Sequence, residues 1–185
     1  MEALEVPRTP FRLDAGEIAL RPTRADDAPA ALEMFADPEM AQWYSGPTPR
    51  SLDRIRAWCL SSSDWSSGEH TTWAIADHND RFVGNLSLAQ IDLEEGTAHI
   101  AYRVAPQVRG RGVATAAVRA ASVWAFDALR LARIELVHAV DNPASCRVAE
   151  KAGYVVEGVK RAGYRDDEGR RWDSHLHAKL ATDPR

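Results

Sequence analysis

The chain has 185 residues, of which 45% are hydrophobic and 27% charged, and its formal net charge is −4. A chain of this length suits one domain and buries roughly 70% of its unfolded surface, which is enough for a core and a cleft. The ordinary charge content excludes a disordered or fibrous protein. The mild acidity argues against a nucleic-acid partner, because a protein that wraps a duplex normally carries a basic excess.

Cysteine content and hydropathy indicate the compartment. Cys59 and Cys146 are too few for a disulfide framework, and neither lies in a Cys-x-x-Cys or Cys/His pattern, so a reducing compartment is the default. No run of about 18 apolar residues is present to span a membrane. Residues 1–11 carry acids and prolines where a signal peptide has basic and then apolar residues. We expect a cytoplasmic protein that binds no membrane.

Hydrophobic periodicity predicts strands and helices after a loose N-terminal arm over residues 1–16. Strands are predicted at 17–22, 70–77, 81–88, 97–104, 133–140, 154–160 and about 171–180. Helices are predicted at about 28–37, 51–63, 110–130 and 142–151. Because antiparallel strands come first and a β-α-β crossover follows, residues 17–181 are expected to form one α/β domain, a mixed sheet with helices on both faces.

The segment Tyr102–Val118 is the most informative part of the chain. A predicted strand ends at Val104, the loop Arg109–Gly112 contains two glycines and two arginines, and a long helix follows. Glycines directly before a helix let the backbone approach an anion, and the free N–H groups and the helix dipole then bind it. The pattern favours a phosphate or pyrophosphate ligand. The alternative is a glycine-rich turn with two solvated arginines.

Two other phosphate motifs fit poorly. A Walker loop needs a lysine after its second glycine, and no lysine follows either glycine here. In the dinucleotide fingerprint, Thr115 occupies the position of the third glycine. Asp141 ends the next strand as a ribose-binding acid does, yet too little chain follows to complete a Rossmann sheet. A nicotinamide-dependent oxidoreductase is therefore a weak alternative.

Three motifs carry a resemblance to a known family. Gln107-Val108-Arg109-Gly110-Arg111-Gly112 matches the Q/R-x-x-G-x-G/A signature of the GNAT superfamily of acyl-CoA-dependent N-acyltransferases. Asn142–Ser145, Glu150–Tyr154 and Glu157-Gly158 resemble the N-x-x-S, E-K-x-G-F and E-G segments of its ribosomal-protein N-terminal (alanine) acetyltransferase branch. The likeness extends over roughly residues 17–180.

The resemblance implies a fold and a bound co-substrate. The fold is a sheet of six to seven mostly antiparallel strands, splayed between the fourth and fifth. Acetyl-CoA would place its pyrophosphate on the glycine loop and its pantetheine arm along the fourth strand, with the Val104 N–H facing the thioester oxygen. The resemblance implies these cofactor-binding residues: Val104, Gln107, Arg109, Gly110, Arg111, Gly112, Val113, Ala114, Asn142 and Ser145.

Acetyl transfer also needs a base, because an amine with a pKa near 10 is protonated at neutral pH, and it gains from a donor to the departing thiolate. The related branch has a Glu in the fourth strand where this chain has His99. His99 is therefore the candidate base, or else a strand histidine bonded to a neighbour. Ser145 is the candidate donor, or a helix serine that merely contacts cofactor or backbone. Tyr102 is a weaker catalytic candidate.

His138, His175 and His177 together could suggest a metal site. No carboxylate or cysteine accompanies them at ligand spacing, so we expect structural or surface roles and no metal. The aromatic residues Trp43, Tyr44, Trp58 and Trp65 around the first two helices leave two interpretations open. They either line the acceptor cleft or pack in the core.

The predicted function is an N-acetyltransferase that moves an acetyl group from acetyl-CoA to a primary amine by direct attack in a ternary complex. The acceptor is a small-molecule amine or a protein N-terminus. A catalytically vestigial CoA-binding module, supported only by His99 in place of Glu, and a longer donor such as succinyl-CoA are the alternatives. The resemblance also implies a possible homodimer, because dimers are common in this family.

Overall fold

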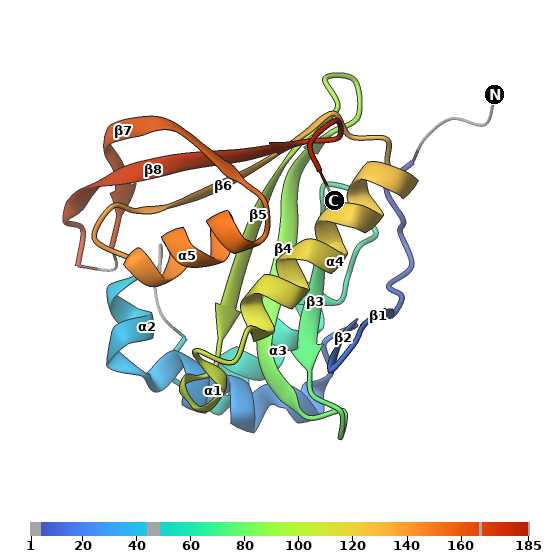
Figure 1. Ribbon diagram of the computed structural model, residues 1–185. Coiled ribbons are helices and arrows are strands. Elements are labelled where there is room, and N and C mark those ends of the chain that lie inside the picture. The colour runs from blue at the N-terminus through green and yellow to red at the C-terminus, as the bar shows by residue number, and fades with distance from the viewer. Residues whose placement is uncertain (1–4, 44–48, 167, 185) are drawn as a thin grey trace.

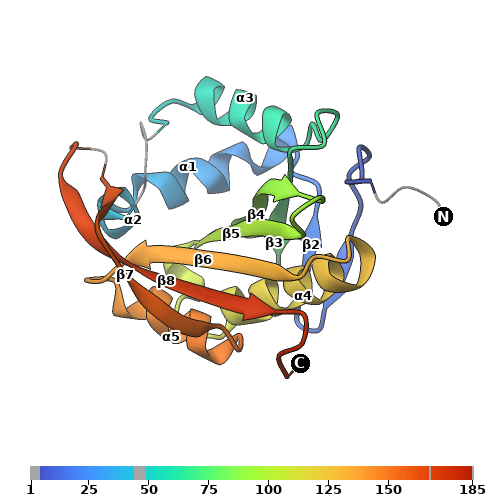
Figure 2. The ribbon, with the colours of Figure 1, turned by 90° about the horizontal axis from the view of Figure 1, so that it is seen from above.

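The computed structural model describes residues 5–43, 49–166 and 168–184. A central sheet crosses the molecule, with α1 and α3 on one face and α4 and α5 on the other (Figures 1 and 2). Its strands are β1 (Leu13–Ala15), β2 (Ile18–Arg21), β3 (His70–Ala76), β4 (Phe82–Asp92), β5 (Thr97–Val104), β6 (Arg133–Ala139), β7 (Val155–Arg165) and β8 (Arg171–Leu180). The helices are α1 (Ala28–Ala36), α2 (Pro38–Gln42), α3 (Leu52–Ser62), α4 (Val113–Ala128) and α5 (Pro143–Lys151). Short 3-10 turns lie at Ala25–Asp27 and Pro106–Val108.

The sheet order is β1-β2-β3-β4-β5-β6-β8-β7, and β5 with β6 is the parallel pair among the paired strands described. That pair is short. Its register runs only from Thr97 opposite Arg133 to His99 opposite Glu135, although both strands continue beyond. The two strands diverge after this point, as Figure 1 shows. The predicted mixed fold and the splay between these strands are confirmed.

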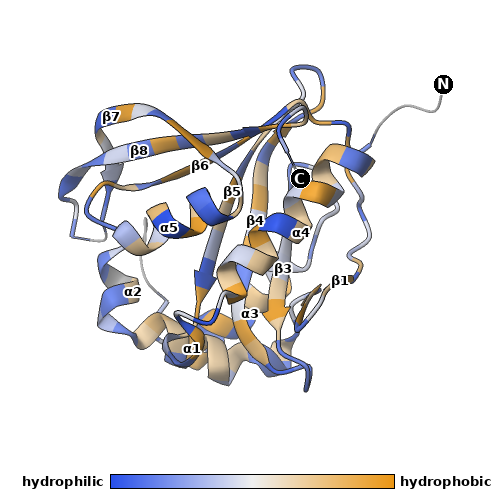
Figure 3. Cartoon of the chain, in the orientation of Figure 1, coloured by the Kyte–Doolittle hydropathy of each residue, from blue (hydrophilic) through white to orange (hydrophobic). Residues whose placement is uncertain are grey.

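Small residues seat the long helix α4 close to the sheet. The buried residues of α4 recur three or four positions apart, as expected of a helix with one apolar face. They include Ala114, Ala117, Val118, Ala121 and Ala125. This face packs into a core cluster that includes the sheet residues Trp73 and Leu86. Figure 3 shows hydrophobic residues along β3 and β4, the central strands of that layer.

The opposite face of the sheet has its own core. Met34 and Phe35 of α1 pack with Ile55 and Cys59 of α3 and with Phe82 at the start of β4. All five are buried. Burial on both faces holds the central strands in place, and the two strand ends at the splay remain the open part of the sheet.

The structure adds elements that periodicity did not predict. Leu13–Ala15 pairs with β2, and the Phe11 carbonyl accepts a 3.2 Å hydrogen bond from Trp73 Nε1, so the end of the N-terminal arm packs on the domain. Three residues are too few to show strand alternation. The described sheet therefore has eight strands, where six to seven were expected. The domain boundary at residue 17 stays a prediction. In the described ranges, we find no helix that is both long and apolar enough to span a membrane.

Candidate active site

A cavity of about 230 Å³ opens beside the point where β5 and β6 part. Tyr102 and Val104 of β5 form one side, and α5 forms the other. The glycine loop and the first turn of α4 close one end, and Glu39, Met40 and Trp43 lie at the α2 side. Strands that diverge leave backbone groups without ladder partners, so the cavity can accept an extended polar chain as well as an anion.

The glycine loop has the backbone that an anion site needs. Gly110 and Gly112 have φ angles of +75° and +81°, a region that residues with a Cβ rarely adopt. Gly112 is the N-cap of α4 and makes no side-chain cap. Gly112, Val113 and Ala114 all line the cavity, and the first N–H groups of a helix have no partner within the helix. The loop therefore presents donors and a positive dipole end to the cavity.

Arg109 is already paired in the structure. Its guanidinium binds Asp37 at 2.5 Å and Glu39 at 2.7 Å, so it fastens the glycine loop to the start of α2. Arg147 and Lys151 of α5 also line the cavity, and they lie four residues apart on one helical face. These two cations were missed by the motif comparison. The available signal was their spacing of four residues from one another within the predicted helix at 142–151.

The start of α5 is fixed by its own cap. Asn142 Oδ1 accepts a 3.0 Å hydrogen bond from the Ser145 backbone N–H, which is the usual geometry of an N-capping side chain. The Asn-x-x-Ser motif is thus a helix start that also aims Ser145 at the cavity.

Ser145 meets Tyr102 across the cavity. The Tyr102 hydroxyl donates a 3.1 Å hydrogen bond to Ser145 Oγ. Burial raises the pKa of Tyr102 to about 12, because the phenolate is poorly solvated there. Tyr102 therefore keeps its proton at neutral pH and can donate a hydrogen bond, and it is unsuited to act as a base.

His99 lies elsewhere, at the last residue pair before the splay. Its Nε2 is 3.7 Å from Glu135 Oε2, and its side chain is 43% exposed. Since side chains alternate along a strand, His99 and Tyr102 point to opposite faces of the sheet. His99 does not line the described cavity. Of the catalytic candidates, His99 thus lies on one face of the sheet, and Tyr102 with Ser145 lies on the other.

Comparison with known proteins decides the family. The profile of the Acetyltransferase (GNAT) domain matches residues 17–155. The chain belongs to the GNAT family of acetyltransferases. The predictions of this family, of its mixed α/β fold and of an acetyl-CoA-dependent N-acetyltransferase are confirmed.

Named relatives include members linked to ribosomal proteins. YdaF of Bacillus subtilis, assigned as a ribosomal N-acetyltransferase, is 38% identical over 86 residues, which span 46% of this chain and 47% of that protein. The spermidine N(1)-acetyltransferase of Vibrio cholerae is 26% identical over 119 residues, 64% of this chain and 67% of that protein. RimJ of Mycobacterium smegmatis, solved with CoA-disulfide, matches with a TM-score of 0.81 at 26% identity, covering 93% of this chain and 86% of that one.

Most of the site residues expected for a GNAT enzyme lie together. The cavity is lined by Tyr102, Val104, Arg109, Gly110, Gly112, Val113, Ala114, Asn142 and Ser145. Gln107 and Arg111 belong to the same loop but are not among its lining residues. The assignment of each residue to binding or catalysis stays a prediction.

The aromatic residues near the first helices divide between the two expected roles. Trp43 lines the cavity and its ring lies 5.9 Å from that of Trp172. Trp65 is fully buried in the core, and Trp58 packs against Phe35. Tyr44 lies outside the described residues. Only Trp43, among those described, contributes to the GNAT cavity.

Proposed function

We propose that acetyl transfer occurs by direct attack of a primary amine on acetyl-CoA in a ternary complex, with acetyl-CoA in the cavity between β5 and α5 and the amine entering where β5 and β6 part. The observation that carries this proposal is the order of groups along the cavity. Anion-binding N–H groups of the α4 N-terminus lie at one end, and the Tyr102–Ser145 hydroxyl pair lies on its walls. A diphosphate and a thioester need these two kinds of group.

The diphosphate of acetyl-CoA would bind the backbone from Gly110 to Ala114. The positive φ angles of the two glycines and the helix N-terminus fit an anion without any metal. Arg147 and Lys151 supply the charge, because Arg109 is held by two carboxylates. The N–H groups at the start of α4 stay available to this ligand, because no side chain caps them.

Tyr102 and Ser145 are proposed to assist departure of the CoA thiolate. The Tyr102 hydroxyl donates to Ser145 Oγ, which makes the serine hydroxyl a stronger hydrogen-bond donor. Ser145 can then donate to the sulfur as negative charge develops on it. Cys146 follows Ser145, but burial and the Glu150 carboxylate raise the pKa of its thiol, which disfavours a covalent acyl-cysteine route.

His99 is proposed as the base, working from the other face of the sheet with Glu135 as its partner. Glu135 Oε2 lies 3.7 Å from His99 Nε2 and can orient the imidazole, while Arg133 holds Glu135 Oε1 at 2.9 Å. The position of His99 at the last β5–β6 pair puts it at the base of the opening through which the strands part.

The proposed acceptor is a protein α-amino group. An α-amine has a pKa of about 7.7–8.0, against about 10.4 for a lysine-type amine, so it needs less help from a base that stands outside the cavity. The relative assigned to ribosomal acetylation supports this choice. A polyamine is the second candidate, favoured by the spermidine acetyltransferase relative.

The test offers acetyl-CoA with N-terminal peptides, N-blocked lysine peptides and spermidine, and follows products by mass spectrometry. The proposal predicts the highest kcat/KM for a free N-terminus. Preference for spermidine would replace the acceptor assignment. CoA binding without turnover on any amine would indicate a vestigial module, and faster transfer from succinyl-CoA would replace the donor.

We also propose a cytoplasmic homodimer with neither nucleic acid nor membrane as partner. Both cysteines are free, which suits a reducing compartment.

The edge strand β7 carries the surface proposed for the dimer. It exposes Val155, Val156 and Val159, an apolar surface that a second copy would cover. Light scattering after size exclusion tests the dimer, since a monomeric mass would reject it.

A further inference from the structure

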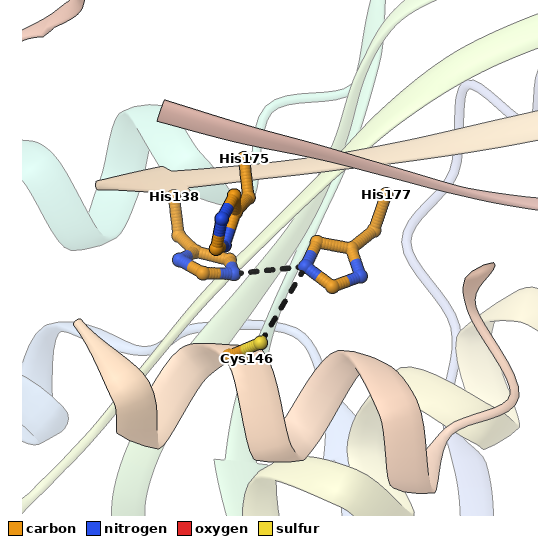
Figure 4. A group of neighbouring side chains, drawn as sticks. All are labelled: His138, Cys146, His175 and His177. Atoms are coloured by element: carbon orange, nitrogen blue, oxygen red, sulfur yellow. Dashed lines mark hydrogen bonds between the residues drawn. The ribbon is translucent and has the colours of Figure 1, made fainter. Parts of the chain in front are cut away.

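Three histidines and a cysteine gather between α5 and the paired strands β6 and β8 (Figure 4). His138 of β6 stands opposite His175 of β8, and His177 follows on the same face of β8. Cys146 of α5 faces them from across the gap. One ligand atom from each residue lies within 4.8 Å of all the others.

The spacing of these atoms is close to that of a tetrahedral metal site. His138 Nε2 is 3.1 Å from His177 Nε2, and Cys146 Sγ is 3.9 Å from the same nitrogen. Zinc bonds of about 2.0–2.1 Å to nitrogen and about 2.3 Å to sulfur would place tetrahedral ligand atoms about 3.3–3.6 Å apart. The two pairs differ from these spacings by a few tenths of an ångström, and the widest pair of the group, at up to 4.8 Å, would close by about an ångström when the ion binds.

The hydrogen bond of His138 gives its ring the tautomer that a metal ligand needs. His138 Nδ1 is 2.8 Å from the Ala139 carbonyl oxygen, which can only accept. The proton is therefore on Nδ1, and the Nε2 lone pair faces the cluster. Ligating histidines use this arrangement, with the second ring nitrogen held by a carbonyl or carboxylate.

Hydrogen bonding alone does not satisfy the cluster. His175 Nδ1 and His177 Nδ1 are buried and lack a hydrogen-bond partner among residues 5–43, 49–166 and 168–184. Buried polar atoms are normally paired, so the unpaired His175 Nδ1 needs an explanation. His177 reaches the group through Nε2, and its Nδ1 lies on the far side of the ring. The Cys146 thiol donates a 3.6 Å hydrogen bond to Glu150 Oε1, and a cation at the site would offset the negative charge of that carboxylate.

The cluster is enclosed but reachable. His138 and His177 are buried, whereas His175 and Cys146 are partly exposed and provide a path for an ion. No cysteine accompanies these histidines at ligand spacing along the sequence. In the fold, α5 packs over β6 and β8 and brings Cys146 into the group.

We propose that His138, Cys146, His175 and His177 form a structural binding site for a zinc-class divalent cation. Four protein ligands leave no open coordination position, which is the pattern of structural rather than catalytic zinc. The cation would fasten α5 to β6 and β8. Since Asn142 and Ser145 lie on the same short helix, it would hold one wall of the acetyl-CoA cavity in place. Acetyl transfer itself needs no metal.

Cobalt(II) titration of the metal-free protein tests the site, because cobalt bound by a thiolate gives an absorption band that nitrogen ligands do not. The wild type should bind one Co²⁺ with a thiolate band, and Zn²⁺ should displace it. Cys146→Ser should lose the band and weaken Co²⁺ binding by at least about tenfold, since even groups that only orient ligands are worth that much. His78→Gln, in the exposed β3–β4 turn, is the matched control and should change nothing.

Thermal unfolding with and without Zn²⁺ gives a second readout if a variant folds poorly. Zn²⁺ should raise the Tm of the wild type and of His78→Gln, and should raise that of His175→Gln much less. His175 is partly exposed, so this substitution disturbs the core little. A wild-type cobalt spectrum without a thiolate band, or equal Zn²⁺ stabilisation in His175→Gln, would overturn the proposal.

Discussion

The Tyr102 hydroxyl donates to Ser145 Oγ at 3.1 Å, and this bond connects β5 to α5 across the cavity where the sheet opens. Its two partners come from segments 43 positions apart in the sequence. The bond therefore depends on the whole crossover from β5 through α4 and β6 to α5. Because the pKa of Tyr102 is raised, the bond keeps a protonated phenol beside Ser145, the residue proposed to face the thioester.

Removing either hydroxyl should slow acetyl transfer. General acid assistance typically contributes about 100- to 10,000-fold, so we expect kcat of Ser145→Ala to fall by about 100-fold at saturating acetyl-CoA. Tyr102→Phe should have a smaller effect, because its phenol acts through the serine. The double variant should resemble Ser145→Ala, since the two groups act in series. Strictly additive losses would contradict this order.

His99→Gln should lower kcat/KM at neutral pH and recover part of it at alkaline pH, where more of the amine is already neutral. Glu135→Gln should cause a similar but weaker change, because the imidazole stays in place and loses its carboxylate neighbour, which also pairs with Arg133. Steady-state rates across a pH series provide the check. A pH–rate profile of His99→Gln parallel to that of the parent would remove His99 from the mechanism.

Gly112→Val tests the diphosphate position. A side chain at φ of +81° is strained, costing about 1–2 kcal/mol of stability, and it would also project from the loop that lines the cavity. Gly16→Val is the matched control, with a φ of +71°, open space around its Cβ and a place in the β1–β2 turn. Both variants should lose similar stability, but only Gly112→Val should lose acetyl-CoA affinity by calorimetry.

Arg147 should contribute more to acetyl-CoA binding than Arg111. A charge-assisted hydrogen bond is worth about 1.5–3 kcal/mol, so Arg147→Ala is expected to raise the Kd by roughly 10- to 150-fold. Arg111 does not line the described cavity, and Arg111→Ala should change the Kd much less. Calorimetric titration of both variants at one ionic strength decides between them. A larger loss in Arg111→Ala would reverse the assignment.

Acid should destabilise the metal-free protein through two imidazoles. Burial lowers the pKa of His138 and of His177, and the neighbouring histidines lower both further. The hydrogen bond to the Ala139 carbonyl opposes this at His138, and Glu150 opposes it at both, but the net direction is down. Their folded-state pKa values thus lie below the unfolded value of about 6.5, so the unfolded chain binds more protons in that window. This contribution to stability is complete above about pH 6.5 and is lost as the pH falls.

Denaturant unfolding at several pH values, with a chelator present, measures this dependence. The wild type should lose stability between neutral pH and pH about 5, and His177→Gln should show a shallower slope. His78→Gln should match the wild type, because its side chain is exposed in a turn. An identical slope for His177→Gln and the wild type would show that His177 does not contribute.

Local signals predicted the parts of the site that come from contiguous sequence. Gly110, Gly112 and the start of α4 follow from glycine placement before an apolar helical pattern. Asn142 and Ser145 were implied by the resemblance of Asn142–Ser145 to the N-x-x-S segment of the family, and in the structure the two residues form the cap at the start of α5. Each of these features depends on backbone conformation within a few residues, which the sequence encodes directly.

Contacts between distant segments were not predictable in the same way. The pairing of Arg109 with Asp37 joins residues 72 positions apart, and nothing near Arg109 in the sequence indicates it. Cys146 joins the histidine cluster only because α5 packs over β6 and β8. The short strand β1 has too few residues to show periodicity, and it forms because β2 offers it an edge.

A crystal structure with acetyl-CoA bound tests the central claim most directly. The account predicts diphosphate oxygens within hydrogen-bond distance of the N–H groups from Gly112 to Thr115, with the sulfur beside Ser145 Oγ. Coenzyme density on another surface, with the space between β5 and α5 filled by protein side chains, would contradict it.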